Sequence, residues 1–221
     1  MLTLLIGNKN YSSWSMRPWV LMRHFDIPFV ERKLRLGSAE FYAVLAPITP
    51  TQTVPVLMDG SLVVPDSLAI AEFMAERNGQ HRVWPADATQ RARARVLCAS
   101  IHAGFQTLRE HMPMNIEASL PGMGWSVAVQ RDIDRICALG DAALQSSGGP
   151  FLFGTFGAVD AFCAPICARF RTYAPRLPGA AAAYAQRMLE LPAVRQWCDD
   201  ARAEHDFIAA GEPYRLRPDW T

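Results

Sequence analysis

The sequence has few features of a polymer-binding, membrane-spanning or disordered protein. Its 22 basic side chains nearly balance its 21 acidic ones, so it lacks the basic excess that is typical of a nucleic-acid binder. Half of its residues are hydrophobic, which excludes a disordered chain, yet no apolar run approaches the roughly 18 residues of a membrane span. Lysine occurs only at Lys9 and Lys33. We therefore expect a folded protein with neither nucleic acid nor membrane as a partner.

The cysteines do not form a pattern that is typical of disulfide or metal-binding proteins. Their number, five, is odd, and the segment Met1–Gly7 is too short and lacks the charged start of a secretory signal. We expect reduced thiols in a cytoplasmic protein. Cys163 and Cys167 lie on one face of a predicted helix, but no ligand pair with zinc-type spacing accompanies them. We expect these two to be buried apolar side chains, and we predict no metal site.

The first part of the chain predicts alternating strands and helices. Short apolar runs such as Leu2–Ile6 have the length of buried strands, and Asp59 with Gly60 between two apolar runs is typical of a hairpin turn. We predict strands at Leu2–Ile6, Phe29–Leu34, Val54–Met58 and Ser61–Val64, and helices at Trp14–Phe25, Ser38–Leu45 and Asp66–Arg77.

The pattern changes at Asn78, where a polar linker begins and runs to Asp87. Beyond the linker, alanine-rich segments have helical periodicity and no convincing strand signal. Asp87, followed three residues later by Gln90, predicts a helix start. We therefore predict a mixed α/β domain at residues 1–79 and an all-α domain at residues 88–221. Its expected helices are Ala88–His111, Trp125–Ser146, Ala158–Tyr173, Gly179–Leu189 and Pro192–Glu204.

Three hydroxyl groups separate the first predicted strand from the first predicted helix. Tyr11, Ser12 and Ser13 stand near unpaired N–H groups and the positive end of the helix dipole, which together stabilise an anion. The same field lowers the pKa of a nearby thiol, and a hydroxyl can donate a hydrogen bond to the resulting thiolate. The alternative function of a serine at this position is to cap the helix.

Two later segments also carry groups that could bind a ligand. Pro55 lies in a strand-like run, where it removes a ladder donor, and it fits either a cis bond at a strand start or an edge strand. A cis bond would leave the N–H and C=O groups of Val54 free to pair with a peptide-like ligand. Asp66 and Ser67 open a helix directly after a strand, where they either bind the charged groups of a ligand or cap the helix.

The order and spacing of these segments resemble the glutathione transferase superfamily over essentially the whole chain. The Ser-Ser-x-Ser-x-Arg pattern of Ser12, Ser13, Ser15 and Arg17 is similar to that of the serine-type, zeta-like branch. The resemblance implies a thioredoxin-like α/β N-terminal domain, an all-α C-terminal helical domain, glutathione as co-substrate and no metal. It also implies a homodimer in which the first domain of one chain contacts the second domain of the other.

The same resemblance assigns the catalytic position. In that branch the first serine of the pattern contacts the glutathione sulfur, and this residue is Ser12, with Ser13 beside it. Tyrosine-type members use a Tyr near the end of the first strand, which makes Tyr11 a rival contact. We favour Ser12 over Tyr11 because its hydroxyl lies nearer the helix N-terminus.

Glutathione-binding positions follow from the resemblance as well. The backbone of Val54, before a cis Pro55, would pair with the cysteinyl unit of the tripeptide. Asp66 and Ser67 would hold its γ-glutamyl end. The complete predicted set is Trp14, Thr53, Val54, Pro55, Asp66 and Ser67.

The acceptor substrate is expected over the first helices of the second domain. Phe105, His111, Met112 and Asn115 are the candidate contacts, together with Met114. Methionine and aromatic side chains at this spacing also fit a hydrophobic core, and a histidine at a helix end also fits plain solvent exposure. We expect a small hydrophobic electrophile as the second substrate.

We therefore predict a glutathione transferase that stabilises the thiolate for attack on this electrophile. Trp14 stands where zeta enzymes have cysteine, which disfavours their isomerase activity, and the motif has no cysteine for disulfide chemistry. The alternatives are a glutathione-dependent peroxidase or isomerase, and a non-catalytic ligand-binding protein of the same fold. A serine hydrolase is disfavoured because the chain lacks a Gly-x-Ser-x-Gly elbow.

Two features of the second domain complete the expectations. Members of the superfamily usually have Ser or Thr three residues before an Asp at the start of a core helix. Here Gly157 stands before Asp160, and since glycine is a tolerated N-cap, we interpret Asp160 as structural. The tail Phe207–Thr221, with Arg215, Arg217, Pro218 and Trp220, either packs over a site or lies on the surface.

Overall fold

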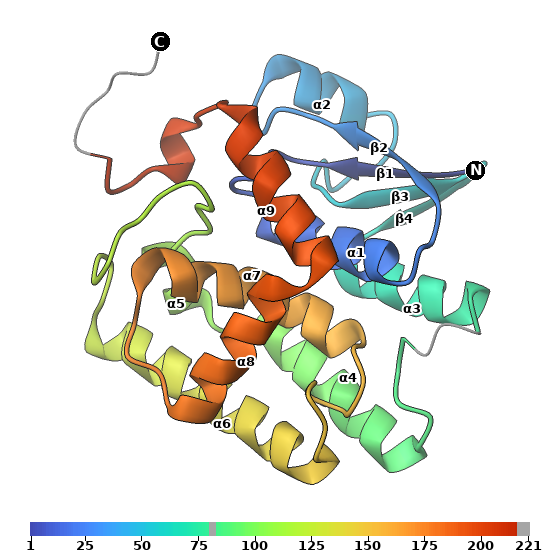
Figure 1. The fold of residues 1–221 in the computed structure, drawn as a ribbon. Coiled ribbons are helices and arrows are strands. Elements are labelled where there is room, and N and C mark those ends of the chain that lie inside the picture. The colour runs from blue at the N-terminus through green and yellow to red at the C-terminus, as the bar shows by residue number, and fades with distance from the viewer. Residues whose placement is uncertain (80–82, 216–221) are drawn as a thin grey trace.

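The computed structural model describes residues 1–79 and 83–215, and its first part is a four-stranded sheet with the order β2-β1-β3-β4 (Figure 1). The first two strands pair in parallel, and the hairpin β3-β4 extends the sheet antiparallel to β1. Each strand overlaps a predicted segment. The strands are β1 (Leu2–Ile6), β2 (Phe29–Lys33), β3 (Val56–Asp59) and β4 (Leu62–Pro65).

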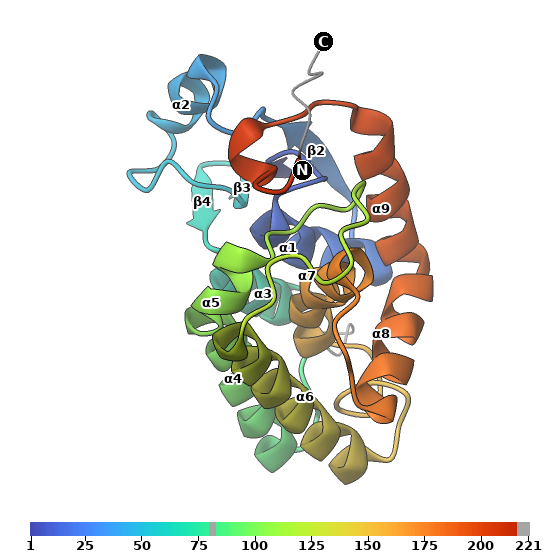
Figure 2. The ribbon, with the colours of Figure 1, turned by 90° about the vertical axis from the view of Figure 1, so that its left-hand side faces the viewer.

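The alternation of side chains along β1 divides the first part into two cores. Leu4 packs in the main core together with residues of α1 (Ser13–His24) and α3 (Ser67–Arg77), whereas Leu5 packs in a smaller core with α2 (Ala39–Leu45). Successive strand residues point to opposite faces of a sheet, so the sheet is covered on both sides. Figures 1 and 2 show α2 on the side of the sheet away from α1 and α3.

The second part is helical. Helix α7 is its centre: almost every one of its 16 residues is buried, and it packs on α1, α4 and α8. Over residues 83–215, β structure is limited to isolated bridges within residues 151–155, which confirms the predicted all-α character. The elements are α4 (Ala88–Ala103), α5 (Gln106–His111), α6 (Val127–Ser147), α7 (Ala158–Tyr173), α8 (Gly179–Glu190), α9 (Pro192–Glu204) and the 3₁₀ turn η1 (Ala209–Gly211).

The predicted continuous helix Ala88–His111 is wrong, because the chain breaks at Gly104 and Phe105. Phe105 adopts a left-handed φ of 60°, and its side chain is buried. A Cβ on Gly104 would lie 2.7 Å from the carbonyl oxygen of Ser100. A bulky residue rarely adopts this backbone conformation, so helical periodicity did not predict the break.

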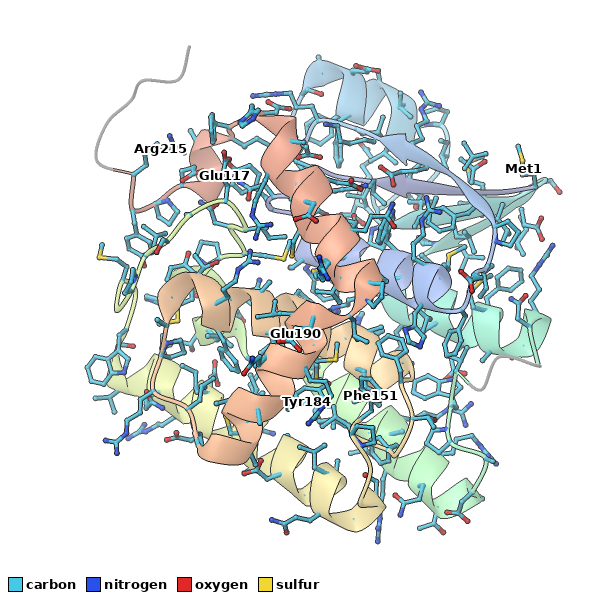
Figure 3. The ribbon with its side chains drawn as sticks, viewed as in Figure 1. Met1, Glu117, Phe151, Tyr184, Glu190 and Arg215 are labelled. Atoms are coloured by element: carbon cyan, nitrogen blue, oxygen red, sulfur yellow. The ribbon has the colours of Figure 1, made fainter. Side chains whose placement is uncertain are left out.

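The predicted structural role of Asp160 is confirmed. Its carboxylate accepts hydrogen bonds from the backbone N–H groups of Gly157 (3.0 Å) and Leu152 (3.2 Å) and from the hydroxyl of Tyr184 (2.8 Å), on α8 (Figure 3). Burial raises its pKa to about 6. A Cβ at Gly157 would lie 2.9 Å from the carbonyl oxygen of Val83, which explains why glycine replaces Ser or Thr at this cap.

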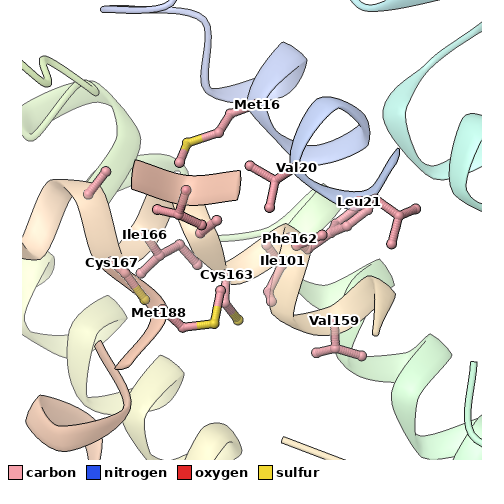
Figure 4. Close-up of a cluster of buried hydrophobic side chains, with 14 of the residues drawn as sticks. Met16, Val20, Leu21, Ile101, Val159, Phe162, Cys163, Ile166, Cys167 and Met188 are labelled. Atoms are coloured by element: carbon pink, nitrogen blue, oxygen red, sulfur yellow. The ribbon is translucent and has the colours of Figure 1, made fainter. Parts of the chain in front are cut away.

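One hydrophobic core runs from the sheet into the helical part. Met16 and Val20 of α1 face Phe162, Cys163 and Ile166 of α7 (Figure 4). The division into residues 1–79 and 88–221 stays a prediction, and part of the linker, residues 80–82, lies outside the described residues.

The cysteines agree with their interpretation as buried apolar residues. All five are free and buried, and burial raises the pKa of Cys163 and Cys167. Among the described residues, no group of three His, Cys, Asp or Glu side chains is placed to hold a metal ion. In the same residues, no helix has both the length and the apolar character to cross a membrane.

Candidate active site

The three predicted site segments meet at one edge of the sheet. Leu5 pairs with Val56, and Val56 pairs with Pro65. The end of β1, the start of β3 and the end of β4 are therefore neighbours. The serines that follow β1, the Val-Pro pair before β3 and the Asp-Ser pair after β4 all extend from this edge.

Ser12 and Ser13 occupy the start of α1. The turn after β1 brings the Ser12 N–H to the carbonyl oxygen of Asn8 (2.8 Å), and both serines are buried, at 7% and 6% exposure. Ser12 is the N-cap residue, but its side chain makes no capping bond. Its hydroxyl instead donates to Ser15 Oγ (2.7 Å), which also accepts from the Gly7 N–H (3.2 Å). Side-chain capping is therefore wrong as the explanation of Ser12.

The hydroxyl of Ser13 has a different partner. Its oxygen accepts a hydrogen bond from Arg169 Nη2 at 3.3 Å. Arg169 extends from α7 and is only 4% exposed. The central helix of the second part thus reaches the first turn of α1.

Tyr11 points toward the C-terminal segment. Its hydroxyl donates to Glu212 Oε1 (2.7 Å) and accepts from the Ile208 N–H (3.4 Å). Burial and the bond to Glu212 raise the pKa of Tyr11 far above its ordinary value. The described part of the tail therefore packs back on the turn after β1, near the point where Glu117 lies (Figure 3). Arg217, Pro218 and Trp220 lie outside the described residues.

Arg17 joins the start of α1 to the start of α3. Its Nη1 donates to Ser67 Oγ (3.3 Å), and Ser67 is fully buried. Arg17 is only 3% exposed, and its Nε is buried without a hydrogen-bond partner among the described residues. Burial and the neighbouring Arg169 and Arg109 lower its pKa to about 9.

Trp14 lies against three cationic or titratable groups. The guanidinium carbons of Arg17 and Arg109 are 4.1 Å and 5.4 Å from its ring centroid, and the ring of His102 meets it edge-on at 4.9 Å. His102 Nε2 is 3.1 Å from Asp66 Oδ2. Because burial lowers the pKa of His102, this contact is a hydrogen bond of a neutral ring at neutral pH.

The Val54–Pro55 peptide bond is cis, as one of the two alternatives predicted, and the edge-strand alternative is wrong. Pro55 precedes β3, and β3 has strands on both sides. Thr53 is exposed beside them, and its hydroxyl donates to Thr51 Oγ1 (3.1 Å).

Asp66 does cap α3, with Oδ1 accepting from the Leu68 N–H (2.7 Å). Its φ is 82°, in the left-handed region that a non-glycine residue rarely adopts. The side chain is exposed at the sheet edge, and its second oxygen, Oδ2, contacts His102 Nε2, so a ligand bound there would share that oxygen with His102.

The predicted acceptor residues do not share one environment. Met112, Met114 and Asn115 are buried, and Asn115 Oδ1 accepts from Asn10 Nδ2 (3.2 Å). His111 is exposed at the end of α5, with Nδ1 3.0 Å from the carbonyl oxygen of Thr107. Their contact with an acceptor, like that of the buried Phe105, stays a prediction.

Sequence reasoning missed four residues that the fold adds: His102, Arg109, Arg169 and Glu212. Arg169 had a detectable signal, since it is the single charged residue in the otherwise apolar stretch Ala161–Phe170, and a charge is rarely buried without a partner. The other three lie on separate elements, and their proximity depends on the fold.

Comparisons with known proteins agree with this architecture. Residues 11–77 match the family model described as glutathione S-transferase, N-terminal domain, and residues 86–200 match that of the glutathione S-transferase, C-terminal domain. The chain belongs to the glutathione S-transferase family. This confirms the resemblance inferred from the serine motif and the order of elements.

The curated relatives of this glutathione S-transferase family member include zeta-class proteins. It is 27% identical to the probable maleylacetoacetate isomerase of Caenorhabditis elegans over 62% of this chain and 63% of the relative. It is also 27% identical to the zeta-class glutathione S-transferase of Euphorbia esula over 64% of this chain and 63% of the relative. The aligned part thus spans under two thirds of these relatives, which support the zeta-like branch.

Solved structures share the fold. A glutathione transferase homolog from Burkholderia gl BGR1, solved with bound glutathione, superposes with a TM-score of 0.69 at 24% identity, covering 92% of this chain and 98% of that one. The glutathione transferase Omega 3C from Trametes versicolor gives a TM-score of 0.69 at 18% identity, covering 89% and 88%.

Proposed function

We propose that the protein binds glutathione at this sheet edge and transfers its thiol to a small hydrophobic electrophile. The observation that supports this most is the start of α1, where Ser12 and Ser13 are buried and Ser13 accepts a hydrogen bond from the buried guanidinium of Arg169. A helix N-terminus and a nearby cation both stabilise an anion. The anion that glutathione offers there is its thiolate.

The remaining segments supply a binding surface for the tripeptide. Val54, before the cis bond, offers its N–H and C=O groups to the cysteinyl unit. Asp66 binds the amino group at the γ-glutamyl end, and Ser67, held by Arg17, binds the carboxylate there. Thr53 and Trp14 flank this surface.

Conjugation requires that the pKa of the bound glutathione thiol be lowered. The thiol gives its proton to solvent, the thiolate forms a carbon–sulfur bond with the electrophile, and the leaving group departs with the bonding electron pair. Lowering the thiol pKa by about two units from about 8.5 would make most bound glutathione nucleophilic at pH 7. No metal takes part in this scheme.

Ser12 remains the first candidate for the sulfur contact. Its hydroxyl can turn toward the sulfur because Ser15 has an O–H of its own to donate back across their 2.7 Å contact. Tyr11 is a weaker candidate, since its hydroxyl already donates to Glu212 and its pKa is raised.

Isomerisation is the second candidate, favoured by relatives named maleylacetoacetate isomerase. The same thiolate would add to an activated double bond and leave after rotation about the former double bond. Trp14, in place of the cysteine of zeta enzymes, is held by Arg17 and Arg109 and would limit access to the sulfur.

The test begins with binding. Thermal unfolding is measured without ligand, with glutathione and with S-methyl glutathione, because a ligand that binds the folded state raises the melting temperature. Activity is then assayed with an electrophile panel, an organic hydroperoxide and a cis-dicarbonyl alkene. No thermal shift with either ligand would refute the proposal, whereas binding without turnover would favour a non-catalytic ligand-binding protein.

We also propose the homodimer that the family resemblance implies. Light scattering of the purified protein is expected to give twice the 24.5 kDa chain mass. A monomeric mass would contradict this part of the proposal.

A further inference from the structure

Arg169 is unusual for a side chain in the centre of a hydrophobic bundle. Its guanidinium makes three hydrogen bonds, from Nε to the carbonyl oxygen of Met112 (2.9 Å), from Nη1 to that of Pro165 (3.2 Å) and from Nη2 to Ser13 Oγ (3.3 Å). Two of these bonds satisfy backbone groups. The third crosses from α7 to the first residue of α1.

This third bond determines what the Ser13 hydroxyl can do. Because its oxygen accepts from a cation, its own hydrogen remains available to donate. A hydroxyl whose oxygen is bonded to a charged donor is polarised and becomes a stronger donor itself. The hydroxyls of Ser12 and Tyr11, in contrast, must first turn away from Ser15 and Glu212, to which they donate.

The surroundings of Ser13 carry excess positive charge. Arg17 and Arg109 lie close enough to Arg169 to repel it, and burial together with Arg109 lowers the pKa of Arg169 to about 10. Arg17 and Arg169 therefore remain cationic at neutral pH, and the third guanidinium, that of Arg109, belongs to a side chain that proteins keep protonated. The neutral groups among the neighbours are Tyr11, Cys98, His102 and Tyr173, since burial raises the pKa of Tyr11, Cys98 and Tyr173 and lowers that of His102.

The nearby carboxylates have other partners. Asp66 bonds to His102 and to the start of α3, Asp132 accepts from the Leu108 N–H, and Glu212 accepts from Tyr11. Arg17 Nε is buried with no partner among the described residues. The cluster thus has the charge and an unused donor for one more anion.

We infer that Arg169 is a positioning residue that holds Ser13 as a second hydrogen-bond donor to the sulfur of bound glutathione. This inference rests on the proposed function. Arg169 orients and polarises the Ser13 hydroxyl, and its charge, with those of Arg17 and Arg109, favours the thiolate over the thiol. The central helix of the second part therefore tunes the reactivity of a thiol bound by the first.

The experiment titrates the thiol of bound glutathione through the ultraviolet absorbance of the thiolate, with the S-methyl glutathione complex as the blank. The proteins are the native chain, Arg169→Met, Arg169→Lys, Ser13→Ala and the Arg169→Met, Ser13→Ala double variant. Arg171→Met is the matched control. Arg171 lies on the same helix and donates to the carbonyl oxygen of Ile116, but it has no bond to α1.

We expect Arg169→Met to raise the midpoint of the titration by about one pH unit, since a cation a few ångströms away is removed from a partly buried thiolate. Arg169→Lys restores the charge and returns part of the shift, and Ser13→Ala raises the midpoint by less. In the Ser13→Ala background the effect of Arg169→Met is smaller than in the native chain, because coupled residues are not additive. Arg171→Met keeps the native midpoint.

A native midpoint in folded Arg169→Met with normal glutathione affinity would overturn the inference and leave the proposed function standing, and so would full additivity in the double variant. If Arg169→Met fails to fold, the inference is tested with Arg169→Lys and Ser13→Ala. A native midpoint in Ser13→Ala would then overturn it. A native chain that binds no glutathione in calorimetry would instead refute the proposed function.

Discussion

The sheet region and the helical region meet at the start of α1 but contribute different chemistry to it. The sheet region offers backbone groups and short side chains on turns, such as Val54 and Ser12. The helical region adds a buried cation, Arg169, to the buried Arg17 of the sheet region. Backbone geometry at a sheet edge suits recognition of a peptide-like ligand, whereas a cation in a low-dielectric interior acts strongly on the ionisation of that ligand.

The two regions should also differ in how they respond to substitutions. The sheet edge is open, with Thr53 and Asp66 exposed, so substitutions there should change binding more than stability. The helical centre is closed, with Asp160 and Arg169 almost fully buried, so substitutions there should change stability as well. The predictions below separate these two behaviours.

The largest effect is expected in the helical region from Asp160→Ala. The change leaves the Leu152 and Gly157 N–H groups and the Tyr184 hydroxyl without their acceptor, which should lower the free energy of unfolding by about 3 kcal/mol. Asp160→Asn keeps one oxygen and should cost about 1–2 kcal/mol. Urea unfolding measures both. A loss in Asp160→Ala no greater than that in Asp160→Asn would contradict the capping role.

The carboxylate of Asp160 also makes the free energy of unfolding depend on pH. The pKa of Asp160 is about 6 in the folded protein, above its ordinary value of 3.8, so ionisation disfavours the folded state. Its contribution to stability is present at low pH and is lost as pH rises from about 4 to about 6. Asp160→Asn should remove this decrease. Urea unfolding across that range checks it, and an unchanged pH profile in the variant would contradict it.

In the sheet region, Ser12→Ala is expected to act on turnover. It should keep glutathione binding and reduce the rate of conjugation about 100-fold, as loss of a donor to a developing or bound anion does. Steady-state kinetics and calorimetry measure the two properties, with Ser61→Ala, at an exposed hydroxyl in the turn between β3 and β4, as the matched control. Unchanged turnover would indicate that Ser13 or Tyr11, and not Ser12, contacts the sulfur.

Two glycines of the helical region, one closely packed and one with open space around it, test whether a Cβ fits at each position. Gly157→Ala should lower the free energy of unfolding by about 1–3 kcal/mol, because its Cβ would meet the backbone carbonyl oxygen of Val83 at 2.9 Å. Gly179→Ala, with open space around its Cβ, should raise it by about 0.5 kcal/mol. Thermal unfolding compares them, and equal effects would rule out the close approach at Gly157.

The smallest effect is expected from Tyr11→Phe. It removes the hydrogen bonds to Glu212 and the Ile208 N–H and should lower the free energy of unfolding by about 1 kcal/mol. Conjugation should remain close to native, since this hydroxyl is engaged by the tail. A large loss of turnover with intact glutathione binding would make Tyr11 the sulfur contact and shift catalysis away from the serines.

Much of the local structure follows from sequence alone. Asp87 caps α4 by accepting from the Gln90 N–H (2.8 Å), as predicted, and Ser38 caps α2 in the same way. The hairpin at Asp59 and Gly60 and the span of α7 also agree. These features depend on residues within one turn or one strand of each other, where capping and side-chain periodicity act.

The sequence by itself therefore determined the order of elements, the cluster of hydroxyls before α1 and the family resemblance. The break at Phe105, the cis form of Val54–Pro55 and the bond between Arg169 and Ser13 were decided by the tertiary structure. A left-handed backbone is rare for phenylalanine, and here the ring of Phe105 is buried, while a buried charge is costly unless it is hydrogen-bonded. Both conditions arise from residues far apart in the chain, since Ser13 and Arg169 are 156 positions apart, and no local pattern encodes such a contact.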